Sequence, residues 1–154
     1  MKHQETAFSL VELLIIVMFL SICAVVAIPR FDYAFISKQK AEAIARKITT
    51  DLRLTRRLAI SDAANNTKGY ELKLVGSVPY HTYEIENIDT HETVASHTID
   101  SDITIGNPTG TRFMYGPLGN LEPASATQIT VSAESKSFSI TINAATGTIK
   151  CVEN

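Results

Sequence analysis

The stretch AFSLVELLIIVMFLSICAVVAIP, residues 7–29, decides how the fold of this 154-residue chain is interpreted. Its side chains are almost wholly apolar, and its one carboxylate, Glu12, stands near its start. As a helix, residues 8–28 would be about 32 Å long, which is enough to span a bilayer. An unpaired acid inside such a helix is costly, so Glu12 is expected to have a partner and a function.

Two other interpretations of this stretch stay open. A cleaved secretory signal could end at Val25-Val26-Ala27, although the charged region before the stretch is thin and an early glutamate is unusual in a signal. The stretch could also be a plain membrane anchor. A lipoprotein signal is disfavoured, because Ile22 rather than a small residue precedes Cys23.

The beginning of the chain carries a family resemblance. A short polar leader, the small residue Ala7, and then Phe8-Ser9-Leu10-Val11-Glu12 before an apolar run resemble the amino-terminal segment of type IV pilins and of type II secretion pseudopilins. The resemblance extends to Pro29, which stands at the spacing expected for the family. It implies that a prepilin peptidase cuts between Ala7 and Phe8 and methylates the new amino terminus. The family usually has glycine before the cut, where this chain has alanine.

The resemblance also implies partners and a location. Glu12 would pair with the amino terminus of a neighbouring processed subunit, and an ammonium group does offset a carboxylate where the dielectric constant is low. The chain would lie in the bacterial inner membrane with a single pass and its C-terminal domain in the periplasm, and would then enter a pilus or pseudopilus. Its partners would be prepilin peptidase, other pilin or pseudopilin subunits through the N-terminal helix, and the inner membrane.

Pro29 marks either a helix end or a kink inside one longer helix. The pattern after it favours continuation, because apolar and small residues recur every three or four positions up to about Ala64, with no Gly or Pro between them. We therefore expect one long helix, half apolar and half amphipathic, whose stripe packs on a sheet. The stripe consists of Ala41, Ala45, Ile48, Leu52, Thr55 and Ala59.

Beyond Gly69 the pattern changes to short runs of period two, which predict strands separated by Gly and Pro. A helix followed by a run of strands predicts an α+β fold, in which the long N-terminal helix packs on an antiparallel β-sheet domain. The expected segments are a leader at 1–7, a transmembrane and assembly helix at 8–29, an amphipathic helix at 30–66 and a C-terminal β domain at 67–154. The expected strands are 70–74, a run within 78–88, 93–99, 103–105, 112–115, 128–132, 138–142 and 148–151.

This second part carries a looser resemblance. The helical run LRLTRRLA at residues 52–59, the segment FMYGPLG at 113–119 and the terminal hairpin with Gly147 resemble the H-type minor pseudopilins and the related minor pilins of type IV pili. The resemblance implies a minor subunit. It does not separate a secretion system from a pilus.

No group of residues predicts catalysis. His81, His91 and His97 lack metal-ligand spacing, and neither a phosphate-binding glycine loop nor a nucleophile elbow is present. The acidic residues from Glu84 to Glu92 are expected to form a solvated face. Cys23 and Cys151 are expected to stay unpaired. The sequence therefore predicts no enzyme activity, no cofactor and no metal site.

Arg53, Arg56 and Arg57 are the candidate residues for a nucleic-acid contact, since phosphate binding requires an exposed basic patch. The simpler interpretation is a solubilising helix face with ion pairs to Asp51 and Asp62. A net charge of −2 and a C-terminal tail that is not basic argue against DNA binding. The sequence thus favours a non-enzymatic minor pilin or pseudopilin, with a DNA-binding minor pilin for natural transformation as the alternative and weak or no DNA binding expected.

Overall fold

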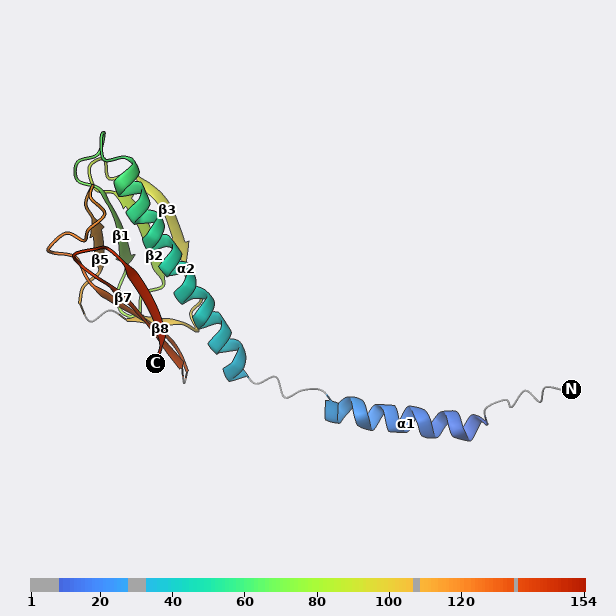
Figure 1. Ribbon diagram of the computed structural model, residues 1–154. Helices are drawn as coiled ribbons and strands as arrows, with labels where there is room; N and C mark the ends of the chain where they lie inside the picture. The colour runs from blue at the N-terminus through green and yellow to red at the C-terminus, as the bar shows by residue number, and fades with distance from the viewer. Residues whose placement is uncertain (1–8, 28–32, 107–108, 135) are drawn as a thin grey trace, which may run out of the picture. The chain divides into compact units, whose positions relative to one another are not determined.

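The computed structural model describes residues 9–27, 33–106, 109–134 and 136–154 (Figure 1). The chain divides into two compact units, Met1–Tyr33 and Ala34–Asn154. The first unit contains helix α1, and the second contains most of helix α2 together with all the described strands.

Helix α1, Leu10–Ala27, has 18 residues and is apolar on every side. Its sequence contains no Gly or Pro, and its one described hydroxyl, on Ser21, donates a hydrogen bond of 2.7 Å to the Val17 carbonyl. The large apolar side chains from Leu10 to Ile22 are between 45% and 80% exposed. A helix that is apolar all round is normally surrounded by other apolar groups, and the described residues of its unit do not cover the α1 side chains from Leu10 to Ile22.

The predicted long N-terminal helix with a membrane-spanning half is wrong. In the part of the chain that the structure describes, no helix is long and apolar enough to cross a membrane. Helix α1 has 18 residues and is about 27 Å long, whereas a bilayer requires roughly 20 apolar residues. The second helix is amphipathic and charged. The same finding overturns the predicted single-pass location in the inner membrane. The predicted kink at Pro29 lies outside the described residues.

Helix α2, Tyr33–Ser61, has 29 residues and turns its predicted stripe inward. All six stripe residues are 0% exposed, which confirms them as the core face of the helix. After the helix, the Asn66 side chain accepts hydrogen bonds from the backbone of Lys68 and Gly69 and donates one to the Gly69 carbonyl. Gly69 has a φ of +81°, and a Cβ there would lie 1.9 Å from the Tyr115 carbonyl oxygen. This glycine therefore permits the close turn from helix to sheet.

The strands form two antiparallel sheets of four strands each, where the sequence predicted one β-sheet domain. The first sheet has the order β3-β2-β1-β5 and the second has the order β4-β6-β7-β8. The link between them is a single bridge between Tyr80 and Ile105 among the described residues. In the first sheet the strands are β1 (Tyr70–Val75), β2 (Thr82–Asn87), β3 (Thr93–Thr98) and β5 (Arg112–Tyr115). In the second they are β4 (Thr104–Gly106), β6 (Gln128–Ala133), β7 (Lys136–Ile142) and β8 (Ile149–Glu153).

One apolar core joins α2 to both sheets. Leu72 of β1 stands in register with Ile85 of β2 and Phe113 of β5, and all three are fully buried. From the second sheet, Val131 and Ile140 are equally buried. Alternate residues of the strands thus face the helix, as the period-two pattern predicted.

The opposite face of the first sheet carries a paired set of charges. Arg112 donates two hydrogen bonds, of 2.6 and 2.8 Å, to the carboxylate of Glu71, whose side chain is only 1% exposed. Lys73 Nζ lies 2.5 Å from Glu86, which also contacts His91 Nδ1 at 2.9 Å. The prediction that the acidic residues at 84–92 form a solvated face is therefore wrong for Glu86, which is 7% exposed.

A candidate binding groove between α2 and β8

One flank of α2 is lined by arginines. Arg46, Thr49, Arg53 and Arg56 follow one another at spacings of three and four residues, which places them on one side of the helix beside the buried stripe. This flank borders β8, whereas Asp51 on the opposite flank contacts His97 of β3. Figure 1 shows α2 between β3 and β8 in the same way.

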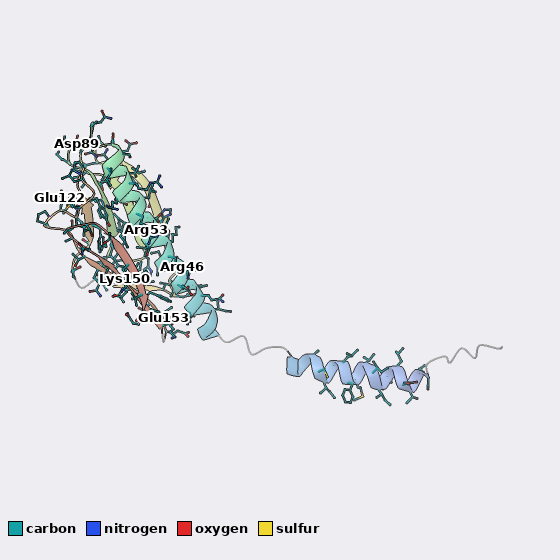
Figure 2. The ribbon with its side chains drawn as sticks, in the orientation of Figure 1. Arg46, Arg53, Asp89, Glu122, Lys150 and Glu153 are labelled. Carbon is teal, nitrogen blue, oxygen red and sulfur yellow. The ribbon has the colours of Figure 1, made fainter. Side chains whose placement is uncertain are left out.

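Two adjoining cavities run between this flank and β8, with Arg53 lining both. The larger has a volume of about 600 Å3 and the smaller about 370 Å3. Together they follow β8 from Glu153 back to the turn at Gly147. Figure 2 shows Arg46 and Arg53 on α2, and Glu153 at the end of β8. The other lining residues of the larger cavity are Glu42, Thr49, Thr50, Phe138 and Cys151, and those of the smaller are Arg56, Arg57, Thr148 and Ile149.

The two ends of the groove differ in charge balance. At the Glu153 end, Arg46 pairs with Glu42 at 2.6 Å, and Glu153 lies 3.0 Å from Lys38 and 2.9 Å from Lys136. The hydrogen bonds from Lys136 and Lys38 hold the pKa of Glu153 below its ordinary value. Charges at this end are therefore already compensated within the chain.

At the Gly147 end, Arg53, Arg56 and Arg57 have no carboxylate partner among the described residues. The expected partners are engaged elsewhere, because Asp51 accepts a hydrogen bond of 2.5 Å from the Tyr83 hydroxyl, and Asp62 accepts one of 2.9 Å from Tyr70. The simpler interpretation of these arginines as ion-paired to Asp51 and Asp62 is therefore wrong. By contrast, carboxylates pair with Lys38, Lys40, Arg46, Lys68, Lys73, Arg112 and Lys136.

Arg56 is held in place by the loops around it. Its Nε donates a hydrogen bond of 2.9 Å to the Gly119 carbonyl. Gly147, with a φ of +65°, comes so close that a Cβ there would lie 2.0 Å from the same carbonyl oxygen and 2.9 Å from Arg56 Nε. Glycine at this position thus allows the β7–β8 turn to close over Arg56, while Arg53 and Arg57 remain exposed.

The remaining predicted site residues do not meet in the described structure. Glu12 lies in the first turn of α1, exposed. Ala7, Phe8 and Pro29 lie outside the described residues. The histidines stay apart, with His91 at Glu86 and His97 at Asp51. No set of three or more His, Cys, Asp or Glu residues that could hold a metal occurs in the described ranges.

Sequence reasoning found the three arginines but not the groove, because the second wall is β8 and nothing local predicts which strand lies beside α2. Two further features escaped it. The Tyr115 hydroxyl is buried and has no hydrogen-bond partner among the described residues, and burial raises the pKa of Tyr115. Burial also raises the pKa of Tyr83, whose hydroxyl donates to Asp51.

Comparison of the chain with known protein families, with curated proteins and with solved structures gives no match.

Proposed function

We propose that this chain is a non-enzymatic filament subunit, a minor pilin or pseudopilin of a type IV pilus or a type II secretion pseudopilus, and that prepilin peptidase processes it. The observation that carries the proposal is α1. It is apolar on every side, exposed from Leu10 to Ala24, and preceded by the Ala7-Phe8 sequence that resembles a prepilin cleavage site.

Assembly into a filament would bury the apolar surface of α1. Each large side chain that passes from water into an apolar contact contributes about 1.5–3 kcal/mol, so a helix with exposed Leu, Ile, Val, Met and Phe on all sides has a strong drive to associate. In a filament, the helices of neighbouring subunits supply that contact to one another. The second unit has its own core and remains available for contacts at the filament surface.

Glu12 fits the same role. A carboxylate placed among packed apolar helices is costly unless a cation lies beside it. Cleavage before Phe8 would create an amino terminus four residues from Glu12, and the amino terminus of an adjacent subunit can offset the charge. An unprocessed chain would lack this ammonium group at Phe8, so assembly should depend on cleavage.

Replacing Glu12 tests this proposal. We expect Glu12→Ala to abolish or strongly reduce incorporation into sheared filaments, while the amount of the protein in cells is unchanged. Glu12→Gln should do the same, because it keeps the size and removes the charge. Ser21→Ala in the same helix is the matched control, since its hydroxyl bonds only within α1. Normal incorporation of both Glu12 variants would remove the filament role of this residue.

A simpler role for Glu12 makes a different prediction. An acid in the first turn of a helix also interacts favourably with the helix dipole, at about 0.3–1 kcal/mol. If that were its only role, Glu12→Gln would lower the helicity of an isolated α1 peptide slightly and leave filament incorporation intact. Measuring both quantities on the same variants separates the two roles.

A further inference from the structure

We propose that the groove between α2 and β8 binds an extended acidic segment of a partner protein, which adds to β8 as an antiparallel strand and places its carboxylates against Arg53, Arg56 and Arg57. This site lies wholly within the second unit. It does not depend on the filament role of α1.

Strand β8 offers an open sheet edge. It is an outer strand, paired with β7 alone among the described strands. Two of the other outer strands are covered, since the N–H groups of Glu122 and Ala126 donate to β5, and Tyr80 donates to Ile105 of β4. The outer strand β3 pairs with β2 alone among the described strands, but it does not border the arginines. An outer strand with unpaired N–H and C=O groups is a template for a further strand.

The register shows which groups of β8 are free. Asn143 N–H bonds to the Thr148 carbonyl, and Asn154 N–H bonds to the Ser137 carbonyl. Hydrogen-bonded and non-hydrogen-bonded pairs alternate along an antiparallel ladder, and the pairs between these two positions follow without a break. The backbone groups of Ile149, Cys151 and Glu153 therefore point away from β7, at the edge that borders the groove.

The charges select the ligand and its direction. Guanidinium groups bind carboxylates through two parallel hydrogen bonds, and the arginine end of the groove supplies three cations that pair with no carboxylate of the described residues. At the Glu153 end the charges are already paired within the chain, so this end does not favour the binding of an anion. An antiparallel segment begins near Glu153 and ends near Ile149, so its acidic residues should stand at its carboxyl end.

The groove suits a peptide better than a nucleic acid. A strand of five residues is about 17 Å long, which matches a peptide of five or six residues. The free carbonyl groups of β8 and the carboxylates of Glu42 and Glu153 would repel a phosphodiester backbone that ran the length of the groove. A peptide instead uses those carbonyls as hydrogen-bond acceptors.

The test uses the full-length chain, dispersed in a mild detergent, and labelled hexapeptides whose binding is followed by fluorescence anisotropy. The probe alternates valine and threonine and ends in two glutamates. Its matched control has the same composition with the glutamates first. Two further controls carry N-methyl groups at alternate residues, one peptide in each phase, and only the phase whose N–H groups face β8 loses its hydrogen bonds. We expect the probe to bind at least about tenfold more tightly than the reversed peptide and than one of the two N-methylated peptides.

Variants of the chain complete the test. Arg53→Ala/Arg57→Ala should weaken probe binding by about tenfold or more, and both side chains are exposed, so the fold should be kept. Lys47→Ala removes an exposed charge on another face of α2 and should leave the affinity unchanged. No binding of the probe, equal binding of the reversed peptide, equal binding of both N-methylated peptides, or stronger competition by duplex DNA than by free probe would each overturn the proposal.

Discussion

Arg112→Ala should destabilise the second unit far more than the loss of an ordinary surface ion pair. Arg112 makes two hydrogen bonds to Glu71, whose side chain is 1% exposed and which stands opposite Glu86 in the register. Removing one partner of a fully buried pair costs about 3–5 kcal/mol, because a buried charge is left uncompensated. The Arg112 side chain is 50% exposed, so water can enter its place and reduce the cost. We expect a loss of about 2–3 kcal/mol.

Urea unfolding of a fragment from Arg30 to Asn154 measures this loss, which corresponds to a fall in Tm of about 10 °C. The control is Glu71→Met/Arg112→Leu, which removes both charges and should stay within about 1 kcal/mol of the parent fragment. An Arg112→Ala loss below about 0.5 kcal/mol, the range of exposed ion pairs, would refute the reasoning that Glu71 depends on this partner.

Charged residues of the first sheet and of α2 lead to further expectations. Hydrogen bonds from Lys73 and then from His91 hold the pKa of Glu86 below its ordinary value of 4.5, so its contribution to stability is present above that pH and is lost as the pH falls through the lowered pKa. Glu86→Gln should therefore flatten the loss of stability below about pH 4.5 in acid-unfolding curves, whereas the exposed Glu92→Gln should not. Duplex DNA should bind the second unit weakly or not at all at about 150 mM salt, because only part of the arginine cluster is exposed. A salt titration that gave low-micromolar affinity, lost in Arg53→Ala/Arg57→Ala, would favour the DNA-binding alternative instead.

The strands were largely predictable from the sequence. Period-two alternation gave β5 its observed bounds and placed β1, β3, β6 and β7 within a residue or two. The stripe on α2 was equally clear, because its members recur at helical spacing with no Gly or Pro between them. The strand bounds and the stripe are set by residues that are close together in the sequence, so the local sequence pattern is enough to predict them.

The division into two sheets could not be predicted in the same way. Tyr70 of β1 pairs with Tyr115 of β5, across a stretch that contains β2, β3 and β4. Nothing within either strand selects that pairing. The groove beside Arg53 could not be predicted either, because it forms only where β8, the outer strand of the second sheet, lies next to α2.

Charged residues were the other source of error. The cluster of acidic residues from Glu84 to Glu92 suggested a solvated face, which is wrong for Glu86, and the burial of Glu71 was not predicted. Arg112 and Lys73 cover these carboxylates, so both are buried. At the N-terminus, the apolar composition of residues 8–28 suggested a membrane span, but α1 ends at Ala27 with 18 residues.

The mass of the intact protein extracted from cells tests the filament proposal most directly. Cleavage by prepilin peptidase leaves a chain that begins at Phe8 and carries one N-methyl group, and the proposal predicts that mass. The Glu12 variants should show the same mass if cleavage precedes the step at which Glu12 acts. A parent chain that retains Met1, or one that begins at Cys23 or after Ala27, would contradict the assignment of this chain to the pilin-like subunits.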